Sequence, residues 1–170
     1  NLKKLNFVKD NISKFEGDIN VDLSGNTIDN LVGDVFVKHA TYHNTKATYS
    51  IDEFYINSAF DQNRVRTITV NSGDIVDGVV VGKFYFNQLQ KLVTNSLGSL
   101  YENYKPIKVN KGQFLKFDFT IHNKIIEIFY PEVSIATNTV VKGTINSDNQ
   151  EFKLNFNSPK ITASDNTFDN

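Results

Sequence analysis

Residues 113–122 read QFLKFDFTIH, the most regular stretch of the chain. Apolar and polar side chains alternate without a break from Leu115 to Ile121. Because successive side chains of a β-strand point to opposite faces, this alternation predicts a strand with one apolar and one polar face. The same period of two recurs in weaker form over most of the chain, which indicates a mainly β fold.

With this stretch, nine short strands are predicted in all, joined by turns rich in Gly, Asn, Asp and Ser. The other eight lie at residues 16–25, 33–42, 48–57, 64–72, 78–86, 125–131, 139–147 and 151–159. Close spacing and tight turns, including one at residues 122–124, favour an antiparallel meander with one solvated face. Asp52 and Glu53 interrupt the alternation of their strand and predict a β-bulge there. The spacing of Leu2, Leu5, Val8 and Ile12 favours a short helix over residues 1–13, and the residues after Pro159 are expected to be frayed.

A single amphipathic helix is predicted at about residues 88–104, within the sequence FNQLQKLVTNSLGSLYENYKP (86–106). Apolar residues recur there at steps of three and four and define a helix seam. The seam consists of Leu89, Leu92, Val93, Leu97, Leu100, Tyr101 and Tyr104. Asn87 is the predicted N-cap, and Pro106 prevents the helix from continuing.

One helix is too small to cover the apolar face of such a sheet. Nine strands of ~17 Å at ~4.8 Å spacing present roughly 700 Å², whereas an 18-residue helix covers roughly 270 Å². The sheet must therefore fold over as a sandwich or barrel, or curl into a groove that holds an apolar ligand. The cleanest alternation assigns twelve residues to one face. They are Ile19, Val21, Leu23, Ile68, Val70, Leu115, Phe117, Phe119, Ile121, Phe152, Leu154 and Phe156.

The composition offers little support for nucleic-acid binding or catalysis. The net charge is −1 with no block of like charge, and cysteine is absent, which excludes disulfides, thiol nucleophiles and thiolate metal sites. No apolar run reaches the ~18 residues that span a bilayer. The chain has no methionine, and we expect residues 1–170 to be one segment of a longer protein.

No motif of catalysis or metal binding is complete. His39 and His43 would lie some 13 Å apart on a strand, too far to share a metal ion, and the third histidine is His122. Residues 78–83 (GVVVGK) lack the spacing of a phosphate loop, and no GxSxG nucleophile elbow is present. Asp74 and Asp77 belong to turn-like sequence, where solvated carboxylates are the usual interpretation. We therefore predict no enzyme, no cofactor and no metal.

Three segments carry a family resemblance: RTITVNSGDI (66–75), NSLGSLY (95–101) and NKIIEIFYPE (123–132). Together with the strands around them, they resemble the central region of TamB-type proteins (translocation and assembly module subunit), in the wider AsmA-like group of bacterial envelope proteins. The resemblance covers nearly the whole chain.

The resemblance implies an open, twisted, U-shaped groove, a β-taco, within a long periplasmic protein anchored in the inner membrane. The twelve residues of the apolar face would then shield phospholipid acyl chains that pass between the membranes. Further partners implied for the full-length protein are adjoining segments of the same chain and an outer-membrane barrel of the Omp85 type. A different function, a protein-interaction or assembly module whose open edges pair with client strands, stays open. So does a closed sandwich that serves as a spacer or carbohydrate-binding module.

Overall fold

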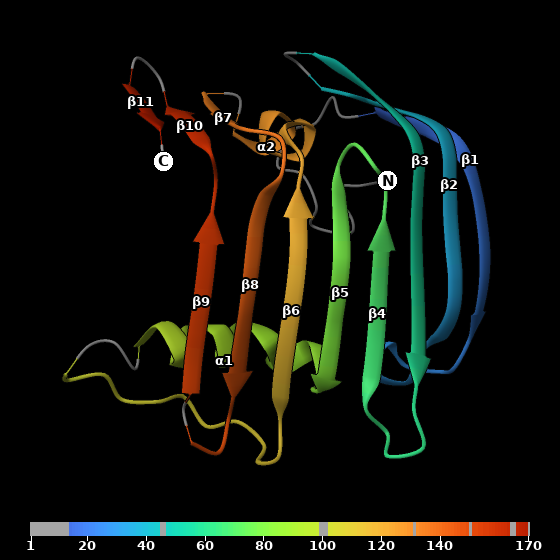
Figure 1. The fold of residues 1–170 in the computed structure, drawn as a ribbon. Helices are drawn as coiled ribbons and strands as arrows, with labels where there is room; N and C mark the ends of the chain where they lie inside the picture. Colours follow the sequence, from blue (N-terminus) through green and yellow to red (C-terminus); the bar gives the residue numbers. More distant parts are fainter. Residues whose placement is uncertain are drawn as a thin grey trace.

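The computed structural model describes residues 14–44, 47–98, 102–130, 132–149, 151–163 and 166–169. Within them, eight strands form one antiparallel sheet in the order β1-β2-β3-β4-β5-β6-β8-β9, and β11-β10-β7 form a small second sheet (Figure 1). The large sheet consists of β1 (Lys14–Ser24), β2 (Val32–His43), β3 (Thr48–Phe60), β4 (Arg66–Asn71), β5 (Val76–Lys83), β6 (Phe114–Ile121), β8 (Thr139–Asn146) and β9 (Glu151–Asn157). The small sheet consists of β7 (Val133–Ile135), β10 (Lys160–Ala163) and β11 (Asn166–Asp169). Two α-helices, α1 (Phe86–Gly98) and α2 (Asn123–Phe129), and the 3-10 turn η2 (Ile28–Asn30) complete the described elements.

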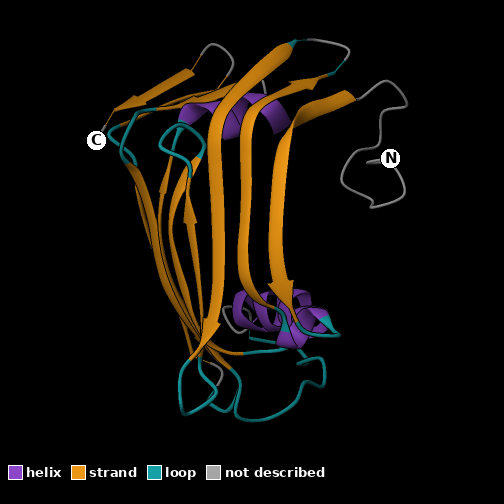
Figure 2. Ribbon diagram, turned by 90° about the vertical axis from the view of Figure 1, so that its right-hand side faces the viewer, coloured by secondary structure: helices purple, strands orange, loops and turns teal. Residues whose placement is uncertain are grey.

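The large sheet is the predicted antiparallel meander. Each strand pairs with the next one in the chain except at β6, which pairs with β8 because α2 and β7 intervene. Edge strands β1 and β9 do not pair with each other, so the sheet stays open. Figure 2 shows β4 to β9 edge-on and β1 to β3 turned away from them, with both helices on the inner side of the bend. The mainly β, curled and open fold is therefore confirmed.

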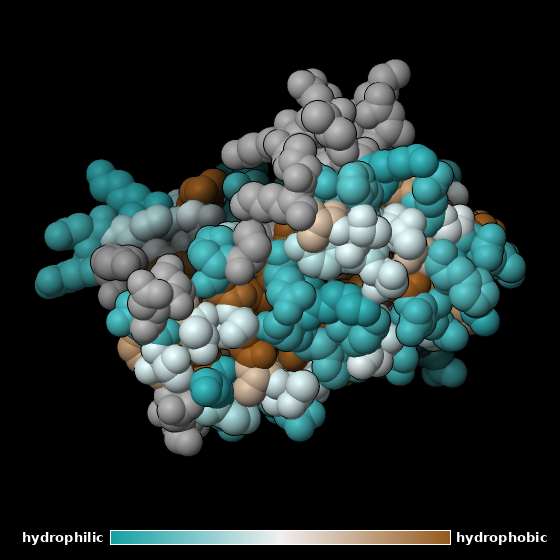
Figure 3. Space-filling model, turned by 90° about the horizontal axis from the view of Figure 1, so that it is seen from above, coloured by the Kyte–Doolittle hydropathy of each residue, from teal (hydrophilic) through white to brown (hydrophobic). Residues whose placement is uncertain are grey.

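The register sorts the side chains into two faces. Ile68 lies opposite Val80, and Val80 lies opposite Phe117. The next two strands, β8 and β9, continue this row as far as Leu154. Residues between these positions point to the other face, where Lys142 pairs with Asp118 at 2.8 Å and Lys38 with Glu53 at 3.9 Å. The sheet thus has an apolar inner face and a charged outer face. Seen from above, apolar side chains show in the middle of the molecule and hydrophilic ones form most of its periphery (Figure 3).

Two glycines of the apolar face lie under aromatic rings. A Cβ at Gly143 would lie 2.4 Å from the ring of Phe117, and one at Gly78 would lie 2.5 Å from the ring of Phe119. Each ring therefore lies over a glycine of the adjacent strand, and the two rings stack with centroids 6.3 Å apart. The aromatic rings fill the gaps that the glycines leave in the sheet surface.

Three local predictions were wrong. Residues 123–129 form α2 rather than a turn and strand, and the residues after Pro159 form β10 and β11 rather than a frayed end. No register shift occurs at Asp52 and Glu53. The bulge lies between β1 and β2, where Gly17 faces both His39 and Ala40, and His39 takes a φ of 47°. The predicted helix at residues 1–13 lies outside the described residues.

Candidate functional site: an open apolar trough

The twelve residues predicted for the apolar face all lie on one face of the large sheet. The register arranges them in four rows that run across the strands. These rows contain Leu115 and Phe152; Leu23, Ile68, Phe117 and Leu154; Val21, Val70, Phe119 and Phe156; and Ile19 and Ile121. We call this surface the trough. The first and last rows are six residue steps apart on β6, which makes the trough about 20 Å long along the strands.

The described part of the chain covers the trough only in part. None of its twelve residues is buried, and those on the edge strands are the most exposed: Val21 is 55%, Leu154 52% and Phe156 51% accessible. Among the described residues, the buried apolar side chains are Ala40, Ile75, Leu92 and Ile145, none of them a member of the trough. Large apolar side chains that stay partly exposed on the inside of a curved sheet are typical of a binding surface rather than a packed core.

Helix α1 closes one end of the trough. It crosses behind β5, β6, β8 and β9 near their ends (Figure 1), where Leu92 (2% exposed) and Ile145 (3% exposed) border the same cavity. The helix therefore lies across the strand ends and leaves most of the apolar face bare. The helix was predicted to lie against the apolar face, and it does so only at this end of the sheet.

The predicted helix seam is buried only in part. Leu92 is buried and Leu89 half-buried, but Val93 and Leu97 are 41% and 45% exposed. Tyr104 lies beyond the end of α1 at Gly98, and Leu100 and Tyr101 fall outside the described residues. Because α1 meets the sheet along a narrow strip, the buried face consists of Leu92 with Ser96 and Gly98 rather than the full apolar stripe. The ring of Tyr104 packs where a side chain at residue 98 would be, which explains the glycine.

The N-terminus of α1 is held by a distant residue. Its first N–H group, that of Phe86, donates to Asp29 Oδ1 at 2.8 Å, so the cap comes from η2, not from the predicted Asn87. An acidic group at this end also interacts favourably with the helix dipole. This cap fixes the helix relative to the turn between β1 and β2.

Three amides, missed by the sequence analysis, attach the segment after α1 to the helix. Asn95 Oδ1 accepts hydrogen bonds from Ile107 N–H and Tyr104 Oη, while Gln88 Oε1 accepts them from Asn110 N–H and Gln113 Nε2. Gln113 is 2% exposed and also accepts from Tyr85 N–H through Oε1. Long-range amide contacts of this kind leave no periodic signal in a sequence.

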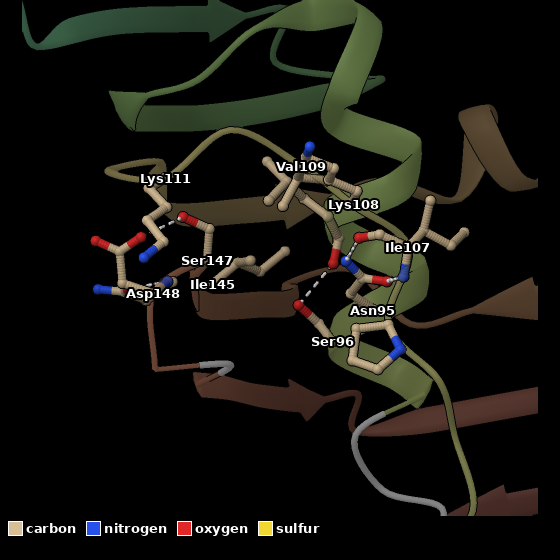
Figure 4. A pocket seen from close by; sticks show the side chains of 12 residues that line it. Asn95, Ser96, Ile107, Lys108, Val109, Lys111, Ile145, Ser147 and Asp148 are labelled. Atoms are coloured by element: carbon tan, nitrogen blue, oxygen red, sulfur yellow. Dashed lines mark hydrogen bonds between the residues drawn. The ribbon is translucent and has the colours of Figure 1, made fainter.

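Between this segment, α1 and β8 lies a cavity of about 450 Å³ (Figure 4). Apolar side chains from three elements border it, among them Leu92, Ile107 and Ile145, and Asn95 lies at its wall. Ser96 also borders the cavity, but its hydroxyl donates to Leu92 O at 2.8 Å within the helix. Ile145 pairs with Leu115 and Phe152 of the first trough row, so the cavity adjoins this end of the trough.

A polar cluster stands at the opposite end. His122 Nε2 lies 2.9 Å from Asp77 Oδ2, and Asp77 Oδ1 accepts hydrogen bonds from the N–H groups of Ser72 and Gly73. Burial acts to raise the pKa of Asp77, but these hydrogen bonds outweigh it and lower the pKa below its usual range. The Asp77 carboxylate therefore holds the turn at Ser72 and Gly73 through hydrogen bonds, and it is not the solvated carboxylate that we predicted.

The cluster does not have the geometry of a Ser-His-Asp triad. Ser72 Oγ donates to Asp74 at 2.8 Å rather than to His122, so no serine, histidine and carboxylate are linked in series. Asp74 also pairs with Lys124 of α2. Across the described ranges, no three His, Cys, Asp or Glu residues are grouped as metal ligands. The two other histidines have separate partners, Asp18 for His39 and Thr48 for His43.

No family model, curated protein or solved structure matches this chain. Within the described part of the chain, no helix is both long and apolar enough to cross a membrane. A functional interpretation of this protein therefore rests on the geometry of the trough and of its two ends.

Proposed function

We propose that the trough shields the acyl chains of phospholipids and that the chain is one non-enzymatic segment of a lipid conduit in the bacterial envelope. The observation that carries the proposal is that none of the twelve trough residues is buried, and that five of them are exposed, on the inner face of an open sheet. The TamB-type resemblance contributes the phospholipid and the periplasm. A conduit segment of this kind needs an apolar path for the acyl chains and a polar outer face that is in contact with water.

The size of the trough suits this ligand. One leaflet of a bilayer core is about 15 Å thick, and the trough is about 20 Å along the strands. Seven spacings between eight strands make it about 34 Å wide, enough for more than one chain. Each apolar side chain that a lipid covers contributes about 25 cal/mol for every Å² removed from water. Binding without a deep pocket is then favourable and not specific for one chain length.

Photo-crosslinking from adjacent residues of β9 tests the proposal. Phe156 belongs to the trough, whereas Asn155 points to the outer face of the same strand. A photo-reactive amino acid at residue 156 should form phospholipid adducts in the bacterial envelope, and the same probe at residue 155 should form few. Equal adduct yields at both positions, or none at residues 117, 119 and 156 of a folded protein, would contradict the proposal.

The open edges support a second candidate, a module that pairs with client strands. Strands β1 and β9 each have one unpaired side within the described sheet, which is a template for another strand. A probe at Asp22 of β1, on the outer face, would then yield protein adducts, and a probe at Lys116 in the middle of that face would not. That result without lipid adducts from the trough would favour the second candidate over the first.

A further inference from the structure

A basic cavity lies at the α1 end of the trough. Its volume is about 290 Å³, and it lies among the β3–β4 turn, the end of β5 and the segment before β6. Its charged lining residues are Arg64, Arg66, Lys83, Lys111 and Asp29, which makes four cations against one carboxylate. None of the four cations has an ion pair within the described part of the chain.

Arg66 is the fixed member of this group. It is 3% exposed, and its guanidinium donates to Ser58 Oγ at 3.3 Å and to Asp29 O at 2.5 Å. It also lies over the ring of Phe60 at 4.5 Å. Burial lowers the pKa of Arg66, and the negative charge of Asp29 opposes this shift. Asp29 uses Oδ1 to accept from Phe86 N–H, so its carboxylate caps α1.

The position of Arg66 joins this cavity to the trough. Arg66 pairs with Gly82, and Gly82 pairs with Leu115, which belongs to the first row of trough residues. The next residue of β4 on the same face is Ile68, about 7 Å away along the strand. A ligand with an anionic head in the basic cavity would therefore place an attached hydrocarbon chain on the apolar surface.

We propose that the basic cavity binds the anionic head group of a lipid whose acyl chain lies in the trough. Guanidinium and ammonium groups form charge-assisted hydrogen bonds with phosphate and carboxylate oxygens. The cavity is smaller than most sites for whole organic ligands, and its size suits a head group. This inference rests on the proposed function and adds a preference to it: anionic lipids bind more tightly than zwitterionic ones.

Calorimetric titration of the whole chain with single-chain lipids below their micelle concentration tests this preference. The probes are lysophosphatidylglycerol, lysophosphatidylcholine of the same chain length, glycerol phosphate and inorganic phosphate. The anionic lipid should bind at least about tenfold more tightly than the zwitterionic one, the factor for one charge-assisted hydrogen bond. The two phosphates alone should bind far more weakly, because they lack the chain.

The variant R64Q/K83Q should lose most of this preference, because its affinity for lysophosphatidylglycerol should fall toward its affinity for lysophosphatidylcholine. Both side chains are exposed, so the substitutions should not unfold the protein. The matched control is K116Q/K160Q, which removes the same charge outside the cavity and should keep the preference. Circular dichroism verifies the fold of both variants.

The outcomes separate the inference from the proposed function. Equal affinity for the two lipids in the unmodified protein, or equal loss in both variants, overturns the head-group site and leaves the trough proposal standing. If inorganic phosphate or glycerol phosphate binds as tightly as the lipid, the cavity is a site for free phosphate and the head-group proposal is refuted. No binding of either lipid overturns both proposals.

Discussion

Substitution of leucine by aspartate at two positions distinguishes an open trough from a packed core. Leu92 of α1 is 2% exposed and Leu154 of β9 is 52% exposed. The variant L92D loses about 1.5–3 kcal/mol of burial and also places a carboxylate in an apolar seam, so its free energy of unfolding should fall by more than about 4 kcal/mol. In L154D roughly half of the side chain is already in water, and the expected loss is about 1 kcal/mol.

Urea denaturation followed by circular dichroism measures both losses. A domain of this size has a free energy of unfolding of about 5–15 kcal/mol. The L92D protein should therefore be largely unfolded even without urea, whereas L154D should give a complete unfolding curve from a folded baseline. The control N155D introduces the same carboxylate on the outer face of β9, where a change within about 0.5 kcal/mol is expected. L154D should nevertheless bind less lipid, because the new charge faces the acyl chain.

The reasoning fails if L154D loses as much stability as L92D. Such a result would mean that Leu154 is covered in solution and that the trough is part of a core. A normal lipid affinity of a folded L154D protein would contradict the placement of the acyl chain on β9.

Three further predictions concern the two ends of the trough. Q113A should lower the free energy of unfolding by about 2–4 kcal/mol, because it removes the hydrogen bonds of a buried amide. The variant Q113E should also have a lower urea midpoint than the unmodified protein, because a carboxylate cannot donate the two hydrogen bonds of Nε2. D29A should cost about 1 kcal/mol through loss of the cap on Phe86 N–H, with D29N less damaging in thermal melts. Because the folded-state pKa of Asp77 is lowered, its hydrogen bonds, including that to His122, stabilise the fold above the ordinary carboxyl pKa of about 4. That contribution disappears as the pH falls through the folded pKa, so D77N should have a flatter stability profile below about pH 4, and an unchanged profile would refute this role.

Two features of the trough follow from the sequence alone. The alternation from Leu115 to Ile121 assigns every second residue to one face, because the period of a strand is two. Tight turns between such stretches then favour antiparallel neighbours, and neighbouring strands keep their apolar sides together. For this reason all twelve trough residues could be named before the register was known.

The two helices show what local patterns leave undetermined. The run from Ile125 to Ile128 suits a strand or a buried helix equally, because short apolar runs have no decisive period. Tertiary contacts support the helix: Asn123 Oδ1 accepts from Ile135 N–H, and Tyr49 Oη donates to Glu127 O. On α1 the periodicity predicts an apolar stripe, but the area of contact with the sheet determines how much of it is buried.

The tertiary structure alone decides how the sheet curls and what lies at its ends. A sandwich, a barrel and an open trough share the same alternation, since each buries or covers the same face. The bend between β3 and β4, the cap from Asp29 to α1 and the basic group around Arg66 depend on residues far apart in the sequence. Their contacts reflect long-range packing and hydrogen bonding, which carry no period along the chain. The strands of the large sheet and their apolar face were therefore predictable, and the closed end of the trough was not.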